Sequence, residues 1–496
     1  MTAPGHDQYP ERDVEDAVSR ILSRHATAVA EGGHEHHDRD GDQLDLAERQ
    51  ALRRVAGMGT ELEDVTEVEY RQLRLEKVVL AGLWTSGTSA DAENSLRELA
   101  ALAETAGSEV LDGVLQRRST PDPGTFLGSG KAVELRGIVE ASGADTVICD
   151  GQLAPSQRRG LEDVVKVKVI DRTALILDIF AQHAKSKEGK AQVELAQLEY
   201  LLPRLRGWGE SMSRQAGGRV AAGAGIGSRG PGETKIELDR RRIRTRMAKL
   251  RREIKAMKPA RETKRANRSR NQVPGVAIAG YTNSGKSSLL NRLTGAGVLV
   301  ENALFATLDP TVRRAETKDG RLYTLADTVG FVRQLPHELI EAFRSTLEEV
   351  ADSDLVLHVV DASHPDPEGQ IAAVRAVLAE VGADAVPEYI VLNKADAADP
   401  EVLDRLQRRE KRSIVVSART GAGIEALNDL ITDELPRPKS QVQVVVPYDR
   451  GDLVNRVHTS GEVLSEEHLA EGTAMAARVN ADLASELEPF AVVAAE

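Results

Sequence analysis

The chain is poor in cysteine, aromatic residues and long apolar runs, and each shortage excludes a class of protein. Its single cysteine, Cys149, cannot form an intrachain disulfide and excludes most cysteine-rich metal sites. Because residues 146–149 read as a buried strand, we interpret Cys149 as core packing. No run of 18 apolar residues occurs and the first residues are acidic, so we expect neither a membrane span nor a signal peptide. These absences predict a cytoplasmic protein.

Aromatic residues make up only 3% of the chain, too few for a surface that binds RNA by stacking bases. The net charge of −13 also argues against a nucleic-acid partner. The charge is segregated, however. Residues 204–270 hold 21 Lys and Arg against 6 Asp and Glu, a net charge of +15, and the remaining residues carry −28. Such segregation indicates one module that binds a polyanion by phosphate and shape readout.

Residues 280–287 read GYTNSGKS and match the phosphate-loop pattern G-x-x-x-x-G-K-[ST] without a mismatch. An apolar run at 276–279 precedes them and a helical pattern at 288–293 follows. In such a loop, backbone N–H groups cradle phosphates, Lys286 neutralises β/γ charge and Ser287 binds Mg²⁺. We therefore predict a nucleoside triphosphate site that contains Gly280, Tyr281, Thr282, Asn283, Ser284, Gly285, Lys286, Ser287 and Ser288.

A second motif, at residues 393–396, follows an apolar run at 389–392 and indicates which base the site binds. The carboxylate of Asp396 suits the N1–H and N2–H₂ donors of guanine, whereas adenine presents an acceptor there. Asn393 is expected to tie this loop to the phosphate loop, and the stem of Lys394 to lie over the base. A site that reads a base by hydrogen bonds discriminates strongly, because the wrong base leaves buried polar groups unpaired. The motif predicts GTP rather than ATP.

Further candidate residues of the nucleotide site lie between these two motifs. Asp327 ends an apolar run at 322–326 and suits a water-mediated contact to Mg²⁺, and the N–H of Gly330 suits the γ-phosphate. Thr307 is the candidate switch threonine that closes on Mg²⁺ and γ-phosphate, with Thr311 as the alternative. We predict Lys286, Thr307 and Gly330 as the catalytic residues.

The last piece follows Asp396. Ser417 and Ala418 end the apolar run 413–418, where a backbone N–H can meet guanine O6. Five pieces in this order, each at a predicted strand end, favour a GTPase over a chance match.

The N-terminal part divides into an acidic extension and a small α/β domain. Residues 1–75 are expected to be a partly disordered tail, since positions 1–50 carry 12 Asp and Glu against 5 Arg. Its histidines, His34, His36 and His37, could alternatively bind a metal. Residues 76–182 alternate helical runs at 91–106 and 131–142 with strand-like runs at 109–116, 145–150 and 165–170.

The pattern of residues 183–271 predicts a basic helical hairpin. Apolar residues spaced 4-3-4-3 at 185–206 and at 236–258 indicate two helices that pair, and Pro203 should kink or end the first. The glycine-rich loop 207–233 forms the tip; a flexible linker is the alternative. Candidate RNA contacts are Trp208, Arg214, Arg219, Arg229, Lys235, Arg240, Arg241, Arg242 and Arg244. Trp208 either stacks on a splayed base or packs at the hairpin end.

We expect residues 272–436 to form the nucleotide-binding (G) domain. Residues 437–496 are expected to form a small α/β or α+β domain. The G domain is expected to hold a mostly parallel sheet with helices on both faces. Its later strands are predicted at 355–361, 389–393 and 413–418, with a closing helix at 423–435. The whole chain is thus an α/β multidomain protein.

Four strings in the sequence resemble the HflX family of translational GTPases, and the resemblance runs from about residue 76 to the end. They are FLGSGK at 126–131, DRTALILDIF at 171–180, GPGETK with ELDRR at 230–241, and LFATLDPT at 304–311. The resemblance implies binding to the large ribosomal subunit, with the hairpin tip near the peptidyl-transferase region, and splitting of stalled or idle ribosomes. It also makes Thr307 the switch threonine. Residues 1–75 lie largely outside it.

Phe331 follows Gly330 where many small GTPases have a glutamine that orients the attacking water. A phenyl ring cannot do so, so we expect slow intrinsic turnover and stimulation by the ribosome. The expected cofactor is Mg²⁺, and the free protein is expected to be a monomer. A GTP-gated ribosome-assembly or scaffold factor, which binds rRNA without splitting, is the main alternative. A GTPase switch for a protein partner is a third, weakened by the basic segment.

Overall fold

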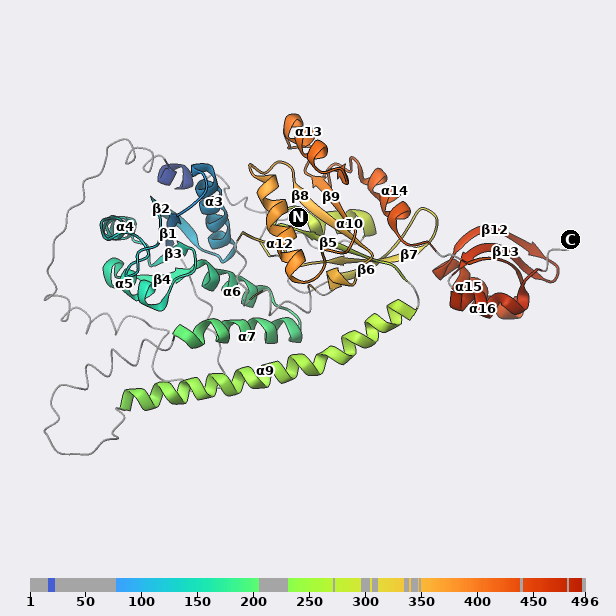
Figure 1. Cartoon of the computed structure of the whole chain (residues 1–496), viewed down its shortest axis with the longest axis horizontal. Coiled ribbons are helices and arrows are strands. Elements are labelled where there is room, and N and C mark those ends of the chain that lie inside the picture. Colours follow the sequence, from blue (N-terminus) through green and yellow to red (C-terminus); the bar gives the residue numbers. More distant parts are fainter. Residues whose placement is uncertain are drawn as a thin grey trace, which may run out of the picture. The chain divides into compact units, whose positions relative to one another are not determined.

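The computed structural model describes residues 17–22, 77–204, 231–270, 273–295, 304–305, 311–333, 339, 347, 349–437, 440–479 and 481–492. The chain forms two compact units, one of Met1–Gln182 with Glu194–Leu250 and the other of His183–Val193 with Arg251–Glu496. None of the described helices is both long and apolar enough to cross a membrane. The predicted α/β multidomain class is confirmed, and most of its elements are labelled in Figure 1.

The first unit contains a parallel four-stranded sheet in the order β2-β1-β3-β4. Its strands are β1 (Lys77–Trp84), β2 (Glu109–Arg117), β3 (Thr146–Asp150) and β4 (Lys168–Asp171). Its helices are α3 (Ser89–Thr105), α4 (Ser129–Ser142), α5 (Pro155–Val165) and α6 (Arg172–His183). Cys149 is fully buried in the core between the sheet and α4 and α5, as the sequence suggested.

The strand predicted at 165–170 is wrong in its first half. Val165 is the last residue of α5, and Lys166 caps this helix in a left-handed conformation with φ +60°. The strand begins only at Lys168. A valine-rich stretch such as 164–170, which is interrupted only by two lysines, does not reveal where a helix ends and the next strand begins.

A helical segment at residues 17–22 packs on the first unit. Ala17, Val18 and Ile21 are almost completely buried. Ile21 Cδ1 comes so near to β2 that a Cβ on Gly113 would lie 2.8 Å from it. This part of the acidic extension is therefore docked, whereas the predicted histidine cluster falls outside the described residues.

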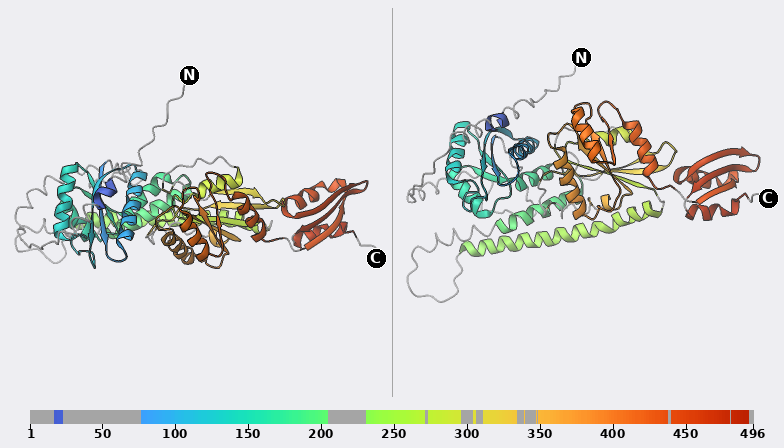
Figure 2. Two further views of the ribbon diagram at one scale, coloured as in Figure 1. Left: turned by 90° about the horizontal axis from the view of Figure 1, so that it is seen from above. Right: turned by 45° about the horizontal axis from the view of Figure 1, so that its top comes forward.

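The next two helices are α7 (Lys187–Arg204) and α9 (Pro231–Arg270), and the right-hand view of Figure 2 shows α9 as one continuous helix. The hydroxyl of Tyr200 donates to Asp171 Oδ1 at 2.8 Å and ties α7 to the end of β4. The guanidinium of Arg246 in α9 donates two hydrogen bonds to the carboxylate of Glu194 in α7, at 2.6 and 2.7 Å. These contacts fasten the two helices to each other and to the sheet.

The second unit contains the six-stranded sheet β10-β9-β8-β5-β7-β6, in which only β6 runs antiparallel to its neighbour. Its strands are β5 (Gly275–Gly280), β6 (Thr311–Glu316), β7 (Leu322–Asp327), β8 (Leu355–Asp361), β9 (Glu388–Asn393) and β10 (Ser413–Val415). Its helices include α10 (Lys286–Thr294), α12 (Pro367–Glu380), α13 (Pro400–Arg409) and α14 (Ile424–Glu434). The predicted strand 413–418 is too long, because Ser417 turns back to bond Gly421 and Ala422.

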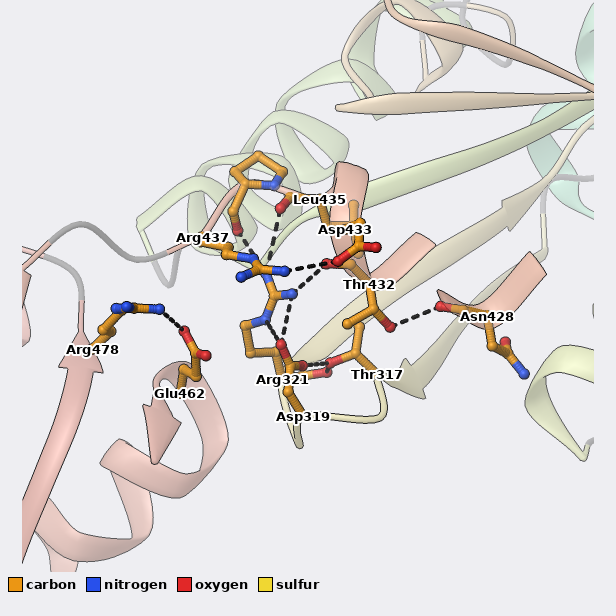
Figure 3. Close-up of polar contacts among 11 residues, drawn as sticks. Thr317, Asp319, Arg321, Asn428, Thr432, Asp433, Leu435, Arg437, Glu462 and Arg478 are labelled. Atoms are coloured by element: carbon orange, nitrogen blue, oxygen red, sulfur yellow. Dashed lines mark hydrogen bonds and ion pairs between the residues drawn. The ribbon is translucent and has the colours of Figure 1, made fainter. Parts of the chain in front are cut away.

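The hairpin between β6 and β7 is anchored by a buried arginine (Figure 3). Arg321 donates to the backbone oxygens of Thr432 at 2.6 Å and Pro436 at 3.1 Å, and its Nε donates to Asp319 at 2.9 Å. A cation at a helix C-terminus satisfies carbonyls that the helix itself leaves unpaired. Arg321 thereby fixes the hairpin of β7 and the edge strand β6 to the end of α14.

The C-terminal region of the second unit is an antiparallel sheet in the order β11-β13-β12 with two helices. The elements are β11 (Ser440–Val446), α15 (Gly451–Ser460), β12 (Glu462–Leu469), β13 (Gly472–Val479) and α16 (Ala481–Leu487). Val446, Leu453, Val457 and Met475 are among its core residues. The antiparallel pairing selects α+β from the two alternatives that the sequence left open.

Candidate functional site

The loop between β5 and α10 approaches two neighbouring strands very closely. Gly280 has φ +152°, and a Cβ there would lie 2.2 Å from the carbonyl oxygen of Val359 in β8. Gly285 has φ +92°, and a Cβ there would lie 2.2 Å from Asn393 Nδ2 at the end of β9. Only glycine accepts both the positive φ and this distance. The two glycines therefore allow the loop backbone to lie directly against the carboxyl-terminal edge of the parallel sheet.

Two hydroxyl groups in this loop are buried without a bond to the protein. Among the described residues, Thr282 Oγ1 and Ser284 Oγ are inaccessible and have no hydrogen-bond partner. A buried polar group left in this state costs about 1–3 kcal/mol. Phosphate oxygens would accept from both hydroxyls, and the N-terminus of α10 adds backbone N–H donors. The loop thus fits a phosphate chain.

Lys286 lies at the start of α10 and is buried. Its Nζ donates to the carbonyl oxygen of Tyr281 at 2.8 Å. Burial lowers the pKa of Lys286 to about 8, although Asp327 acts in the opposite direction. Gly330 comes so close that a Cβ on it would lie 3.2 Å from this Nζ and 2.7 Å from Thr282 Cγ2. The backbone at Gly330 and the lysine therefore converge on one point.

We expect the affinity for GDP to depend on the ionisation of Lys286. Phosphates bind the ammonium form, and this form is lost above its pKa of about 8. The dissociation constant should stay level below about pH 7 and rise steeply, approaching about tenfold per pH unit, above about pH 8. Fluorescent GDP titrated between about pH 6.5 and 9 measures this. The Lys286→Arg variant, whose charge persists, should give a flatter profile; a flat wild-type profile contradicts the assignment.

Ser287 and Asp327 supply an oxygen pair beside the loop. Ser287 Oγ donates to Asp327 Oδ2 at 2.9 Å. Hydroxyl and carboxylate oxygens are the ligands that Mg²⁺ prefers. The pair therefore fits a magnesium ion held by Ser287 directly and by Asp327 through water. Thr307, the third expected ligand, lies outside the described residues, and Thr311 begins β6.

The base-recognition motif is tied to the phosphate loop by one side chain. Asn393 donates from Nδ2 to the carbonyl oxygen of Ser284 at 2.8 Å. Its Oδ1 accepts from the backbone N–H of Ala418 at 3.0 Å. The phosphate loop, the end of β9 and the turn after β10 are thereby joined at one side chain.

Asp396 has a partner on each carboxylate oxygen. Ser417 Oγ donates to Oδ1 at 2.6 Å, and Arg419 pairs with Oδ2 at 2.7 Å. The hydrogen bond from Ser417 is the main cause that lowers the pKa of Asp396, and the charge of Arg419 adds to it. Lys394 has φ +61°, and its Nζ contacts Asp361 at 2.7 Å. An ionised, oriented carboxylate is the acceptor that the N1–H and N2–H₂ groups of guanine require.

Phe331 is buried, with only 1% of its surface exposed. Its backbone pairs with the phosphate loop, because the N–H of Thr282 donates to its carbonyl at 2.7 Å. The ring therefore belongs to the core. Slow intrinsic turnover stays a prediction.

The candidate RNA contacts are only partly within the described residues. In α9, Arg241, Arg242 and Arg244 are exposed, whereas Arg240 is half-buried and its Nε is covered. Lys235 also belongs to α9. Four candidates lie outside the described residues: Trp208, Arg214, Arg219 and Arg229.

Two arginines at the base site were not predicted from the sequence. Arg419 pairs with Asp396, and its position directly after Ala418 could have drawn attention to it. Arg292 of α10 donates to the carbonyl oxygens of Ala418 and Arg419 at 2.8 and 2.7 Å. No sequence pattern links Arg292 to residues that lie over a hundred positions away.

Most of this chain is similar to known proteins. Three family models match in succession: GTP-binding GTPase N-terminal at residues 93–181, GTP-binding GTPase Middle Region at 183–268, and 50S ribosome-binding GTPase at 275–394. GTPase HflX of Lacrimispora saccharolytica is 44% identical over 86% of this chain and 98% of its own. GTPase HflX of Escherichia coli is 44% identical over 73% of this chain and 84% of its own. A solved GTP-binding protein from Sulfolobus solfataricus in complex with GDP is 25% identical, covers 72% of this chain and 98% of its own, and has a TM-score of 0.38.

Proposed function

Because this chain belongs to the HflX family of GTPases, we propose that it binds the large ribosomal subunit and dissociates stalled or idle ribosomes. The chain is a GTP hydrolase of a ribosome-binding GTPase family. In this proposal residues 272–436 form the G domain and residues 183–271 form the hairpin, whose tip lies near the peptidyl-transferase region. Residues 76–182 and 437–496 are the flanking domains.

The observation that carries the proposal is the concentration of positive charge beside a GTPase domain. Residues 204–270 carry a net charge of +15 in a chain whose net charge is −13. Along α9, the side chains of Arg241, Arg242 and Arg244 are exposed. A helix of this kind suits the phosphates of ribosomal RNA. A switch that contacts only protein has no need for it.

The G domain acts on GTP mainly by positioning and by neutralising charge. Lys286 and the N–H groups of the phosphate loop bind the phosphate oxygens, and Asp396 holds the base. Ser287, Asp327 and Thr307 would hold Mg²⁺, which when bound neutralises charge on the β- and γ-phosphates. The N–H of Gly330 reports whether the γ-phosphate is present.

Hydrolysis by the isolated protein is expected to be slow, since Phe331 cannot orient the attacking water. The ribosome supplies or positions the missing group. GTP orders the switch regions, at about residues 300–315 and 327–345, and hydrolysis releases them. The nucleotide thereby controls how the basic hairpin rests on RNA.

Sedimentation of intact ribosomes tests the proposal. With the protein and a non-hydrolysable GTP analogue, we expect free subunits in place of whole particles. A variant with Lys286→Ala should leave the ribosomes intact, because it cannot hold the triphosphate. Whole ribosomes that co-sediment with the wild-type protein would favour the scaffold function and reject splitting.

A further inference from the structure

The base site has a second link to the phosphate-loop helix, made by Arg292. Its Nε donates to the carbonyl oxygen of Ala418 at 2.8 Å, and its Nη2 donates to the carbonyl oxygen of Arg419 at 2.7 Å. The guanidinium is a rigid, planar fork, so two adjacent carbonyls on it fix both the position and the tilt of the loop. Bonds from a charged donor are also stronger than bonds between neutral groups.

The loop that Arg292 holds makes the contacts that orient the base-reading side chains. Ser417 and Arg419 each bond one oxygen of Asp396, at 2.6 and 2.7 Å. The N–H of Ala418 bonds Asn393 Oδ1 at 3.0 Å. A shift of residues 417–419 would therefore move the carboxylate of Asp396 and the amide of Asn393 together.

The loop has little regular structure of its own to resist such a shift. Strand β10, which precedes it, has only three residues. Gly421 and Gly423 follow at φ +88° and φ +74°, conformations that other residues rarely adopt. Outside the turn itself, Asn393 and Arg292 are the side chains that hold its backbone from neighbouring elements among the described residues.

We propose that Arg292 is a positioning residue for guanine recognition, which keeps Asp396 aligned with the N1–H and N2–H₂ edge of the base. This inference rests on the nucleotide site described above and not on ribosome splitting. The phosphate-loop residues that are expected to bind GDP, 280–288, precede Arg292 in the chain. Loss of Arg292 should therefore weaken reading of the base while the phosphate loop stays intact.

The test compares the binding of GDP and inosine diphosphate, which lacks the 2-amino group that Asp396 reads. In the Arg292→Ala variant we expect GDP affinity to fall about tenfold or more and the affinity for inosine diphosphate to fall much less. The Arg292→Lys variant, which keeps the charge but offers one donor nitrogen in place of two, should recover part of the preference. Arg405→Ala is the matched control: Arg405 is an exposed helical arginine that grips Glu368 at 2.9 Å, and its loss should leave the preference unchanged.

Thermal unfolding of each variant is measured in parallel. Equal losses for both nucleotides, accompanied by a lower midpoint, would show a merely structural role and overturn the proposal. An unchanged ratio of the two affinities in Arg292→Ala would overturn it as well. A wild-type chain that binds the two nucleotides equally would instead refute guanine reading by Asp396. None of these readouts depends on ribosomes, so a failure of splitting stays separate.

Discussion

Replacing Asp396 with asparagine is expected to exchange guanine preference for xanthine preference, with GTP affinity falling about a thousandfold. The asparagine amide puts an NH₂ group opposite the 2-amino group of guanine, so two donors face each other. Xanthine carries a carbonyl at that position and can accept from the amide. The variant also loses the ion pair with Arg419, which holds one carboxylate oxygen at 2.7 Å.

Competition of GTP and xanthosine triphosphate against a fluorescent nucleotide measures both changes. Asp399→Asn is the matched control, because Asp399 caps α13 and asparagine caps helices equally well. This control should retain guanine preference. If Asp396→Asn still bound GTP as tightly as the wild type, the base would be read elsewhere.

Neutralising three exposed arginines on α9 should produce the other large effect. In the triple variant Arg241→Gln, Arg242→Gln and Arg244→Gln, the affinity for the large ribosomal subunit should fall about a hundredfold near physiological salt. Each phosphate contact removed lowers the slope of log affinity against log salt by roughly 0.7–0.9, so the slope should fall by about 2–3. The structure favours this set over Arg240, whose side chain is half-buried.

Pelleting assays across about 50–300 mM KCl measure this slope. The control removes the same charge from another place, with Arg408, Arg409 and Lys411 each replaced by Gln. These exposed residues lie at the end of α13 and just after it, and their loss should change affinity by less than about twofold. If the α9 variant kept the slope of the wild type, α9 would not be the RNA-binding element.

The sequence predicted those elements whose signal is local. The phosphate loop is recognisable because its glycines, lysine and serine act within eight consecutive positions. Buried parallel strands such as β8 are visible as continuous apolar runs. Strand β12 has no such signal, because from Leu464 to Leu469 it is exposed and its residues are mostly polar. A strand at the edge of a small sheet needs few apolar residues and resembles a loop in sequence.

By itself, the sequence determined that the chain is a GTPase of the HflX family and where its nucleotide motifs lie, since these depend on neighbours along the chain. Only the tertiary structure decided that Arg292 bonds the base loop, that Arg246 is the residue of α9 that pairs with Glu194 and that Ile21 docks on β2. Such contacts unite residues from about 50 to 130 positions apart. They arise from the packing of whole elements, and no local pattern of residue types encodes which side chain will meet which carbonyl.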